Sequence, residues 1–320
     1  MRKVIKQLKK AQTIALFSHS SPDPDTIGST IALFLALKQM GKDVSLFCSG
    51  ELPTNFAFIE EYSLYNKSFE TYDLLVSVDT ASSSMLGDFE ERFLSHPNTA
   101  RVDHHTGGED YAKVNLVKHH SACAVLIFNL LKKAKAKITP KIATLLYFAL
   151  AGDTGLFRNS GADAESFLIA SKLIDFGADK NMIMKEYFDK KTVPFVQLTS
   201  SCLLNADINK KLGFVIMTAS LDDYKKFGAT VNENVGNLPN TYLACGFKVA
   251  VILKEKEDGI RCSFRSAPDI DVSKIAEVFG GGGHKNAAGC LIEKTMAKAK
   301  ADVKKAIKEY LSHGGNTNAN

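Results

Sequence analysis

The chain lacks the features that mark several large classes of protein. Its six cysteines are far apart and none forms a C-x-x-C pair, which argues against a disulfide framework and a zinc ribbon. The apolar run from Ile14 to Phe17 is too short for a signal peptide, and no later run approaches a membrane span. Arginine is scarce, with six against 34 lysines, and the formal net charge of +5 is spread along the chain. We therefore expect a cytoplasmic protein with reduced thiols and no strong basic stripe for long nucleic acids.

The length and the periodicity of the chain predict two domains. With 320 residues and 45% apolar content, the chain can form two separate cores. In the first part, short β-prone runs alternate with helical patterns, which predicts an α/β domain with a parallel sheet covered by helices. The predicted strands are Thr13–Ser18, Val44–Phe47, Leu74–Val78 and Ala100–Val102. The predicted helices are Thr26–Met40, with Asp25 as its expected N-cap, Ala122–Lys135, Lys141–Leu150 and Ala164–Phe176.

The second part of the chain predicts a smaller mixed α/β domain. A polar and aromatic segment around residues 186–194 has no strand pattern and is interpreted as the connector. We place the first domain at 1–185, the connector at 186–205, the second domain at 206–313 and a disordered tail at 314–320. Further strands are predicted at Phe214–Thr218, Phe247–Lys254 and Ile260–Phe264, with a hairpin turn at 257–259 between the last two.

Four acidic and imidazole clusters lie along the first domain. They are His19-x-x-x-Asp23-x-Asp25, Asp79, Asp103-His104-His105 and Asp153. Each ends or follows a short apolar run, and the ends of strands in an open α/β sheet converge on one crevice. Taken singly, each cluster also fits a capped turn, a helix end or a salt bridge, although this alternative is weaker for Asp103-His104-His105. Together they predict a two-metal hydrolytic centre, in which His104 would bind metal and His105, facing another way, would contact substrate.

A glycine-rich segment marks the second domain. Phe279 is followed by four glycines and then by His284-Lys285-Asn286-Ala287-Ala288-Gly289. Glycines allow backbone N–H groups to turn toward an anion, and a helix beginning near His284 would add its positive end. A flexible hinge is the simpler alternative. We interpret the segment as a phosphate cradle, with the nearby Arg265 as a bidentate partner. His119-His120 is interpreted as an exposed cap, and His96 and His313 as surface residues.

As a set, these motifs resemble the DHH phosphoesterase superfamily, and the segment Gly281–Gly289 resembles its associated C-terminal domain. The resemblance covers nearly the whole chain and implies an active site in the cleft between two domains. It implies one metal bound by His19, Asp23 and Asp79, and a second bound by Asp25, Asp79, His104 and Asp153. It assigns catalytic roles to Asp103 and His105. The implied substrate contacts are Arg265, Ser266, Gly281, Gly282, Gly283 and His284.

The resemblance also implies a reaction. It points to a manganese-dependent phosphodiesterase that hydrolyses short oligoribonucleotides or linear dinucleotides to mononucleotides, like bacterial nanoRNases. The alternatives are a phosphatase acting chiefly on 3′-phosphoadenosine 5′-phosphate (pAp), a manganese pyrophosphatase and a non-enzymatic nucleotide sensor. A pyrophosphatase would lack the Gly281–Gly289 motif. Met85, Gly107-Gly108 and Val125 depart from the family pattern, but none is an expected metal ligand. A homodimer is compatible with the sequence, which does not determine the oligomeric state.

Overall fold

The computed structural model describes residues 1–50, 52–66, 68–105, 107–108, 110–159, 161–231 and 235–312. It divides the chain into two compact units, Met1–Lys190 and Lys191–Asn320, each described below by itself. The predicted tail 314–320 and His313 lie outside the described residues. Within these ranges, no helix has the length and apolar character needed to cross a membrane.

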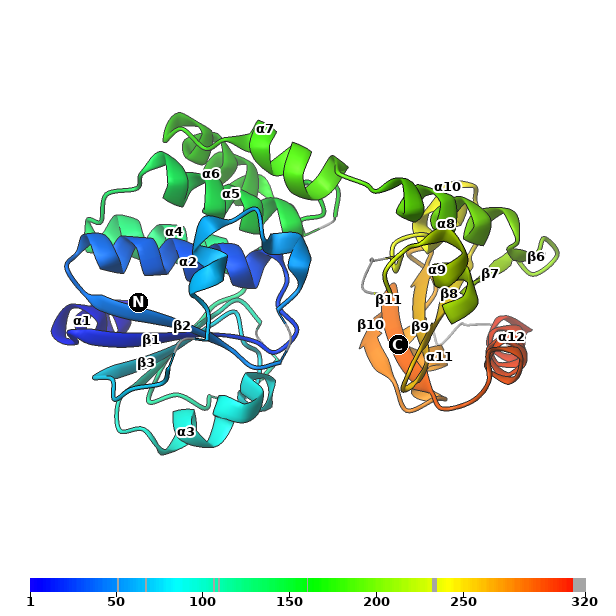
Figure 1. The fold of residues 1–320 in the computed structure, drawn as a ribbon, viewed down its shortest axis with the longest axis horizontal. Coiled ribbons are helices and arrows are strands. Elements are labelled where there is room, and N and C mark those ends of the chain that lie inside the picture. Colours follow the sequence, from blue (N-terminus) through cyan, green and yellow to red (C-terminus); the bar gives the residue numbers. More distant parts are fainter. Residues whose placement is uncertain are drawn as a thin grey trace, which may run out of the picture. The chain divides into compact units, whose positions relative to one another are not determined.

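Unit 1 is built on a parallel sheet, of which Figure 1 labels β1, β2 and β3. Its strand order is β2-β1-β3-β4-β5. The strands are β1 Thr13–Ser18, β2 Asp43–Cys48, β3 Leu74–Val78, β4 Thr99–Asp103 and β5 Val114–Val117. The four predicted strands are confirmed, and the short, half-buried β5 was missed. In this order the chain reverses its direction of winding between β1 and β3. The loops after these two strands therefore lie at the switch point where ligands bind in such sheets.

Helices cover both faces of this sheet. The large core lies under α2 Pro24–Gln39, α4 Cys123–Ala134 and α5 Pro140–Asp153, and α1 Arg2–Lys10 adds Val4 and Leu8 to it. The other face carries α3 Glu90–Ser95 (Figure 1), and Phe93 of this helix packs with Phe17 and Phe47. The remaining elements are α6 Ala164–Asp175, α7 Lys180–Ile183, the π-helix Met184–Asp189 and the 3₁₀ segments Thr54–Phe56, Glu60–Leu64 and Ser83–Phe89.

Helix α2 is almost wholly buried, since it lies between the sheet and α5. At Gly28, an added Cβ would lie 2.5 Å from the carbonyl oxygen of Leu145, so glycine permits this close approach of the two helices. The N-cap of α2 corrects the sequence interpretation. It is Asp23, whose carboxylate accepts from the Thr26 N–H at 3.0 Å, whereas Asp25 lies within the first turn. Pro24 fits the first helical position because its missing N–H would have no partner there.

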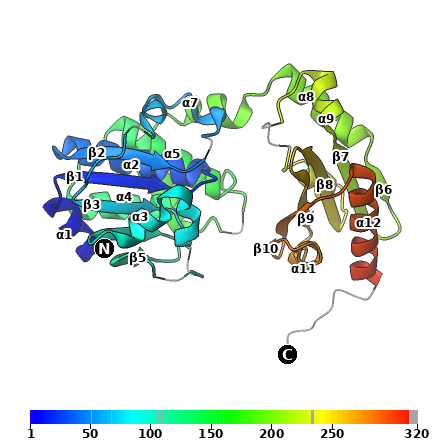
Figure 2. The ribbon, with the colours of Figure 1, turned by 60° about the horizontal axis from the view of Figure 1, so that its bottom comes forward.

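Unit 2 contains a mixed sheet with the strand order β10-β11-β9-β8-β7-β6, in which only the described pair β7 and β8 is parallel. The strands are β6 Asp207–Asn209, β7 Phe214–Ala219, β8 Val249–Lys256, β9 Gly259–Ser266, β10 Gly282–His284 and β11 Ala287–Ile292. Helices α11 Ser273–Glu277 and α12 Met296–Ser312 pack on one face (Figure 2). Helices α8 Val193–Leu204, α9 Leu221–Phe227 and α10 Pro239–Ala244 pack on the other. The predicted mixed α/β fold of this part is confirmed.

Candidate metal centre

The loop between β1 and α2 supplies the first candidate ligands. His19 follows β1 directly and is buried, and burial lowers the pKa of its imidazole, against the opposing charge of Asp23. A lowered pKa keeps the ring neutral, which is the form that binds metal. Asp23 is exposed and uses its carboxylate to cap α2. Because the capping bonds engage Oδ1, its other oxygen stays open to a cation.

Asp25 lies beneath this loop with only 1% of its surface exposed. Its carboxylate accepts from the Ser29 hydroxyl and from the backbone N–H groups of Cys123 and Ala124 at 2.5 and 3.0 Å. Those N–H groups begin α4, whose own N-cap, Ala122, has no side chain that could cap it. Asp25 therefore ties α2 to the amino terminus of α4. Burial, and then the neighbouring Asp153 and Asp23, raise the pKa of Asp25 well above its ordinary value.

Asp79 follows β3 in an unusual backbone conformation, with a positive φ of 56°. One carboxylate oxygen accepts from the Thr26 hydroxyl at 2.6 Å. The other, Oδ1, is buried and has no hydrogen-bond partner among the described residues. Burial, and then Asp25 and Asp23, raise the pKa of Asp79 well above its ordinary value. A buried carboxylate oxygen without a donor is costly unless a cation meets it.

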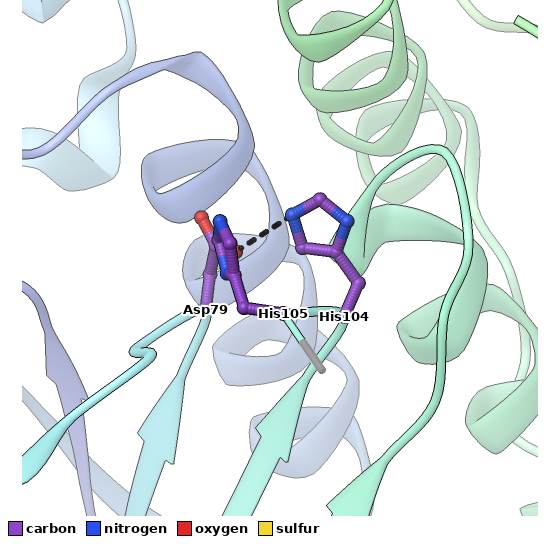
Figure 3. A group of neighbouring side chains, drawn as sticks. All are labelled: Asp79, His104 and His105. Carbon is purple, nitrogen blue, oxygen red and sulfur yellow. Dashed lines mark ion pairs between the residues drawn. The ribbon is translucent and has the colours of Figure 1, made fainter. Parts of the chain in front are cut away.

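His104 faces three of these carboxylates. Its Nδ1 lies 3.0 Å from the carbonyl oxygen of His120, and a carbonyl can only accept, so Nδ1 carries the proton and Nε2 is free to bind metal. Nε2 lies 3.5 Å from Asp79 Oδ1, 3.5 Å from Asp153 Oδ2 and 3.9 Å from Asp25 Oδ2. Figure 3 shows the contact with Asp79. Nδ1 of His120 lies 2.8 Å from Oε2 of Glu165, so the His120 ring pairs with Glu165 and contributes only its backbone carbonyl to His104.

Asp153 reaches the cluster from the end of α5, far along the sequence. The preceding residue, Gly152, makes this possible, because an added Cβ would lie 2.4 Å from Cβ of Pro24. The close contact brings the end of α5 against the loop that carries Asp23 and Asp25. A glycine beside the acid is therefore required by packing at this position.

Ligand atoms of the predicted residues meet in three overlapping groups, within 4.8 Å in each. They are His19, Asp23 and Asp79; Asp25, His104 and Asp153; and Asp79, His104 and His105. Asp79 and His104 each belong to two groups. This donor set suits a divalent cation. It contains carboxylates that repel one another, the free Nε2 of His104 and the buried Oδ1 of Asp79, which has no hydrogen-bond partner among the described residues. All six predicted metal ligands are thus brought together in unit 1.

Asp103 and His105 form a pair beside this cluster. Asp103 is fully buried, and its Oδ1 lies 2.8 Å from Nδ1 of His105. Burial alone would raise the pKa of Asp103, but hydrogen bonds from His105 and Arg101 lower it. The hydrogen bond to Asp103 in turn raises the pKa of His105 against the effect of burial. An ionised Asp103 accepts the Nδ1 proton and leaves Nε2 of His105, which is half-exposed, for other contacts.

Sequence reasoning missed the groups that hold these ligands in place. Arg101, Thr26 and the N–H groups of Cys123 and Ala124 each contact a predicted site residue. Only Arg101 gives a sequence signal, since it is a charged residue within an apolar strand that leads into Asp103. Backbone donors leave no signal in the sequence at all.

In unit 2 the glycine-rich segment forms a hairpin of β10 and β11. The predicted helix beginning near His284 is therefore wrong. The consecutive small residues Ala287–Cys290 pair with β9 as part of a strand, and the preceding helix α11 ends at Glu277. An added Cβ would meet backbone of β11 at 2.2 Å from Gly281 and 2.6 Å from Gly283, but would meet nothing within 4 Å from Gly282. Packing thus explains two of these glycines and leaves Gly282 unexplained.

The other predicted contacts of unit 2 differ in exposure. His284 is exposed on β10, at the open edge of the described sheet. Arg265 is half-buried on β9, and burial lowers the pKa of its guanidinium. Ser266 is buried, and its hydroxyl donates to the carbonyl oxygen of Ile270 and accepts from the Asn286 amide. Ser266 therefore has an internal structural role in unit 2.

Comparison with known proteins agrees with both units. Residues 13–150 match the DHH family, N-terminal domain, and residues 227–313 match the DHHA1 domain. The bifunctional oligoribonuclease and PAP phosphatase NrnA of Bacillus subtilis is 28% identical over 298 residues, covering 90% of this chain and 92% of that protein. NrnA of Thermus thermophilus is 27% identical, covering 98% and 95%. An exopolyphosphatase-related protein from Bacteroides fragilis has the same fold, with a TM-score of 0.90 at 22% identity over 98% of this chain and 96% of that one.

Proposed function

The chain belongs to the DHH family of phosphoesterases and combines its N-terminal domain with a DHHA1 domain, and from this premise we propose that it is a manganese-dependent phosphodiesterase of short oligoribonucleotides and linear dinucleotides. One observation carries the proposal. Asp25, Asp79 and Asp153 converge on the free Nε2 of His104 within 3.9 Å. The DHH family uses divalent metals, and this donor set fits them.

The proposed roles follow the three groups of ligand atoms. One metal would be held by His19, Asp23 and Asp79, and the other by Asp25, Asp79, His104 and Asp153, so that Asp79 is shared. When bound, two divalent ions supply the positive charge that activates a water molecule and polarises a phosphoryl oxygen. Oxygen and imidazole ligands without any thiolate suit manganese, although other divalent ions use the same donors.

His105 is the proposed proton donor or charge-stabilising group. Asp103 accepts the Nδ1 proton and so orients the ring, and when the ring is charged its Nε2–H can donate to a phosphoryl or leaving-group oxygen. The hydrogen bond to Asp103 raises the pKa of His105, which shifts the ring toward the charged form that such a donor requires. In unit 2, Arg265, His284 and the N–H of Gly282 are the proposed contacts to a substrate phosphate.

The likeness to NrnA supports the choice of substrate. The two NrnA proteins are named as oligoribonucleases and as PAP phosphatases, and their similarity extends over both domains. Linear dinucleotides and nanoRNA are our first candidates for this chain, and pAp is the second. A sensor that binds nucleotides without hydrolysis is disfavoured because all six predicted ligands are present and clustered. A cleft between the two domains and a homodimer stay predictions from the sequence.

A substrate panel tests the proposal directly. The purified protein is incubated with Mn²⁺ and, in separate reactions, with pApA, short RNA, short DNA, pAp and pyrophosphate. We expect the highest kcat/KM for pApA or short RNA, with mononucleotide products. Asp79→Asn and His104→Ala serve as inactive controls, and His119→Ala, at an exposed residue outside the cluster, as an active one. Preference for pAp would favour the second candidate, and activity confined to pyrophosphate would refute both.

A further inference from the structure

Arg101 occupies the middle of β4 and is completely buried, although it is charged. Its guanidinium forms an ion pair with Asp103, two residues along the same face of the strand, and donates to the carbonyl oxygen of Ala81 at 2.9 Å. Its Cζ also lies 5.0 Å from the centre of the Tyr111 ring. A planar guanidinium can meet several acceptors at fixed angles while stacking on an aromatic face. Arg101 thus joins three separate segments of unit 1.

The first consequence concerns Asp103. Arg101 engages its Oδ2, which leaves Oδ1 to accept from both the backbone N–H and the Nδ1 of His105, at 3.2 and 2.8 Å. The carboxylate therefore cannot rotate without breaking one of these contacts. The orientation of the His105 ring depends, through Asp103, on a buried arginine.

The second consequence concerns Asp79. Its positive φ of 56° is a strained conformation for a residue other than glycine, and such strain persists only where the surroundings fix it. Arg101 holds Ala81, two residues further on, and the Tyr111 hydroxyl donates to the carbonyl oxygen of Thr80 at 3.0 Å. The turn that presents Asp79 is therefore anchored from β4 and from the Tyr111 ring that stacks on Arg101.

We propose that Arg101 is a positioning residue for hydrolysis, which holds the Asp103–His105 pair and the Asp79 turn in fixed relation across β4 and β3. The inference rests on the proposed function for its kinetic readout. Stability alone does not explain the arginine, because a buried ion pair is often replaced by apolar residues at no cost. An apolar residue in place of Arg101 could not hold the Asp103 carboxylate and the Ala81 carbonyl at the same time.

Four variants test this: Arg101→Lys, Arg101→Met, Asp103→Asn and the double variant Arg101→Met/Asp103→Asn. We expect Arg101→Met to lower kcat about 10- to 100-fold with little change in KM, the usual effect of losing a group that orients active-site residues. Lysine keeps the charge, but it is shorter and lacks the planar guanidinium that lies against the Tyr111 ring, so Arg101→Lys should fold like the wild type and recover only part of kcat. Arg101 acts on His105 through Asp103 but on the Asp79 turn directly through Ala81, so the double variant should be slower than Asp103→Asn by less than the full factor lost in Arg101→Met.

Thermal unfolding separates this role from a purely structural one. Arg101→Met leaves the Asp103 carboxylate buried without its cation, so this variant should have a lower unfolding midpoint than the wild type. The double variant removes that uncompensated charge, so its midpoint should return while its kcat stays low. The inference is wrong if kcat returns together with the midpoint, or if the two single losses multiply in the double variant.

A Mn²⁺ titration by calorimetry provides a readout that does not depend on activity. We expect weaker binding in Arg101→Met, where the Asp79 turn loses its contact at Ala81, and near-wild-type binding in Asp103→Asn, which keeps that contact. If both variants bind Mn²⁺ like the wild type, the positioning of Asp79 by Arg101 is excluded. If the wild type binds Mn²⁺ but hydrolyses none of the substrates, the proposed function fails, and this titration still decides the part of the inference that concerns Asp79.

Discussion

The candidate residues of unit 1 and unit 2 differ in how firmly the protein holds them. In unit 1, Asp25, Asp79 and Asp103 are buried and fixed by hydrogen bonds from neighbouring helices and strands. In unit 2, His284 and Gly282 are exposed on the short strand β10. Rigid placement suits groups that must meet a reacting atom, whereas exposed groups suit the binding of a ligand. We therefore expect changes in unit 1 to lower kcat and changes in unit 2 to raise KM.

The largest effect should come from Asp79. Asp79→Asn removes the charge that both predicted metals share, and we expect kcat on pApA to fall more than about 100-fold. The same change relieves repulsion among buried carboxylates, so the metal-free variant should unfold at a higher temperature than the metal-free wild type. Kinetics and thermal unfolding check the two results. A variant that loses only substrate affinity would break the proposed division between the units.

A smaller effect is expected at Gly152, where an added Cβ would lie 2.4 Å from Pro24. Gly152→Ala should push the end of α5 away and move Asp153, with a loss of stability of about 1–3 kcal/mol and a lower kcat. Gly161→Ala is the matched control, since its Cβ would meet nothing within 4 Å. If both variants behave like the wild type under denaturant and in the assay, the close contact with Pro24 does not position Asp153.

The stability of the metal-free protein should depend on pH in a defined direction. Asp25 and Asp79 have raised pKa values in the folded state, so above their ordinary value of 3.8 the folded protein binds more protons than the unfolded chain. The free energy of unfolding then falls as pH rises from 3.8 toward the raised pKa values of the two carboxyls. The fall is at most about 1.4 kcal/mol per pH unit for each carboxyl. Two groups act in the opposite direction, because their pKa values are lowered in the folded state: Asp103 below pH 3.8, and His19 below its ordinary value of 6.5.

Denaturant melts across this range, with and without Mn²⁺, provide the measurement. Bound Mn²⁺ should remove the loss of stability at higher pH, because its positive charge offsets the repulsion between the ionised carboxylates. A metal-free protein whose stability rises steadily with pH would show that the carboxylates of unit 1 do not repel one another as the structure indicates.

The smallest effect is expected at Gly282 in unit 2. Gly282→Ala meets no protein atom within 4 Å, so the unfolding midpoint should stay unchanged. If a phosphate approaches its backbone, KM should rise roughly three- to tenfold, the equivalent of about one hydrogen bond, while kcat is kept. Gly283→Ala offers a contrast, since its Cβ would collide with Ala287 and should lower the midpoint. An unchanged KM for Gly282→Ala would remove this residue from the binding surface.

Sequence reasoning predicted the elements whose pattern is strong. The apolar runs that form β1 and β3 and the caps near α2 predicted strands and a helix close to those observed, and the acids at their ends predicted residues that the structure brings together. It failed where contacts between distant segments of the chain determine the local structure. The segment Gly282–Ile292 has no alternating apolar pattern and becomes a hairpin only because β9 offers an edge to pair with. The capping of α4 by Asp25 is likewise a contact across 98 residues that no local pattern reveals.

The central claim is that unit 1 binds two divalent ions through a shared Asp79. Calorimetric titration of Mn²⁺ into the wild type and Asp79→Asn tests it most directly, with metal content confirmed by elemental analysis. The account predicts two ions per chain in the wild type and a marked loss of affinity for both in Asp79→Asn, because one carboxylate serves the two sites. Two ions bound by Asp79→Asn with wild-type affinity, or no tight binding by the wild type, would contradict it.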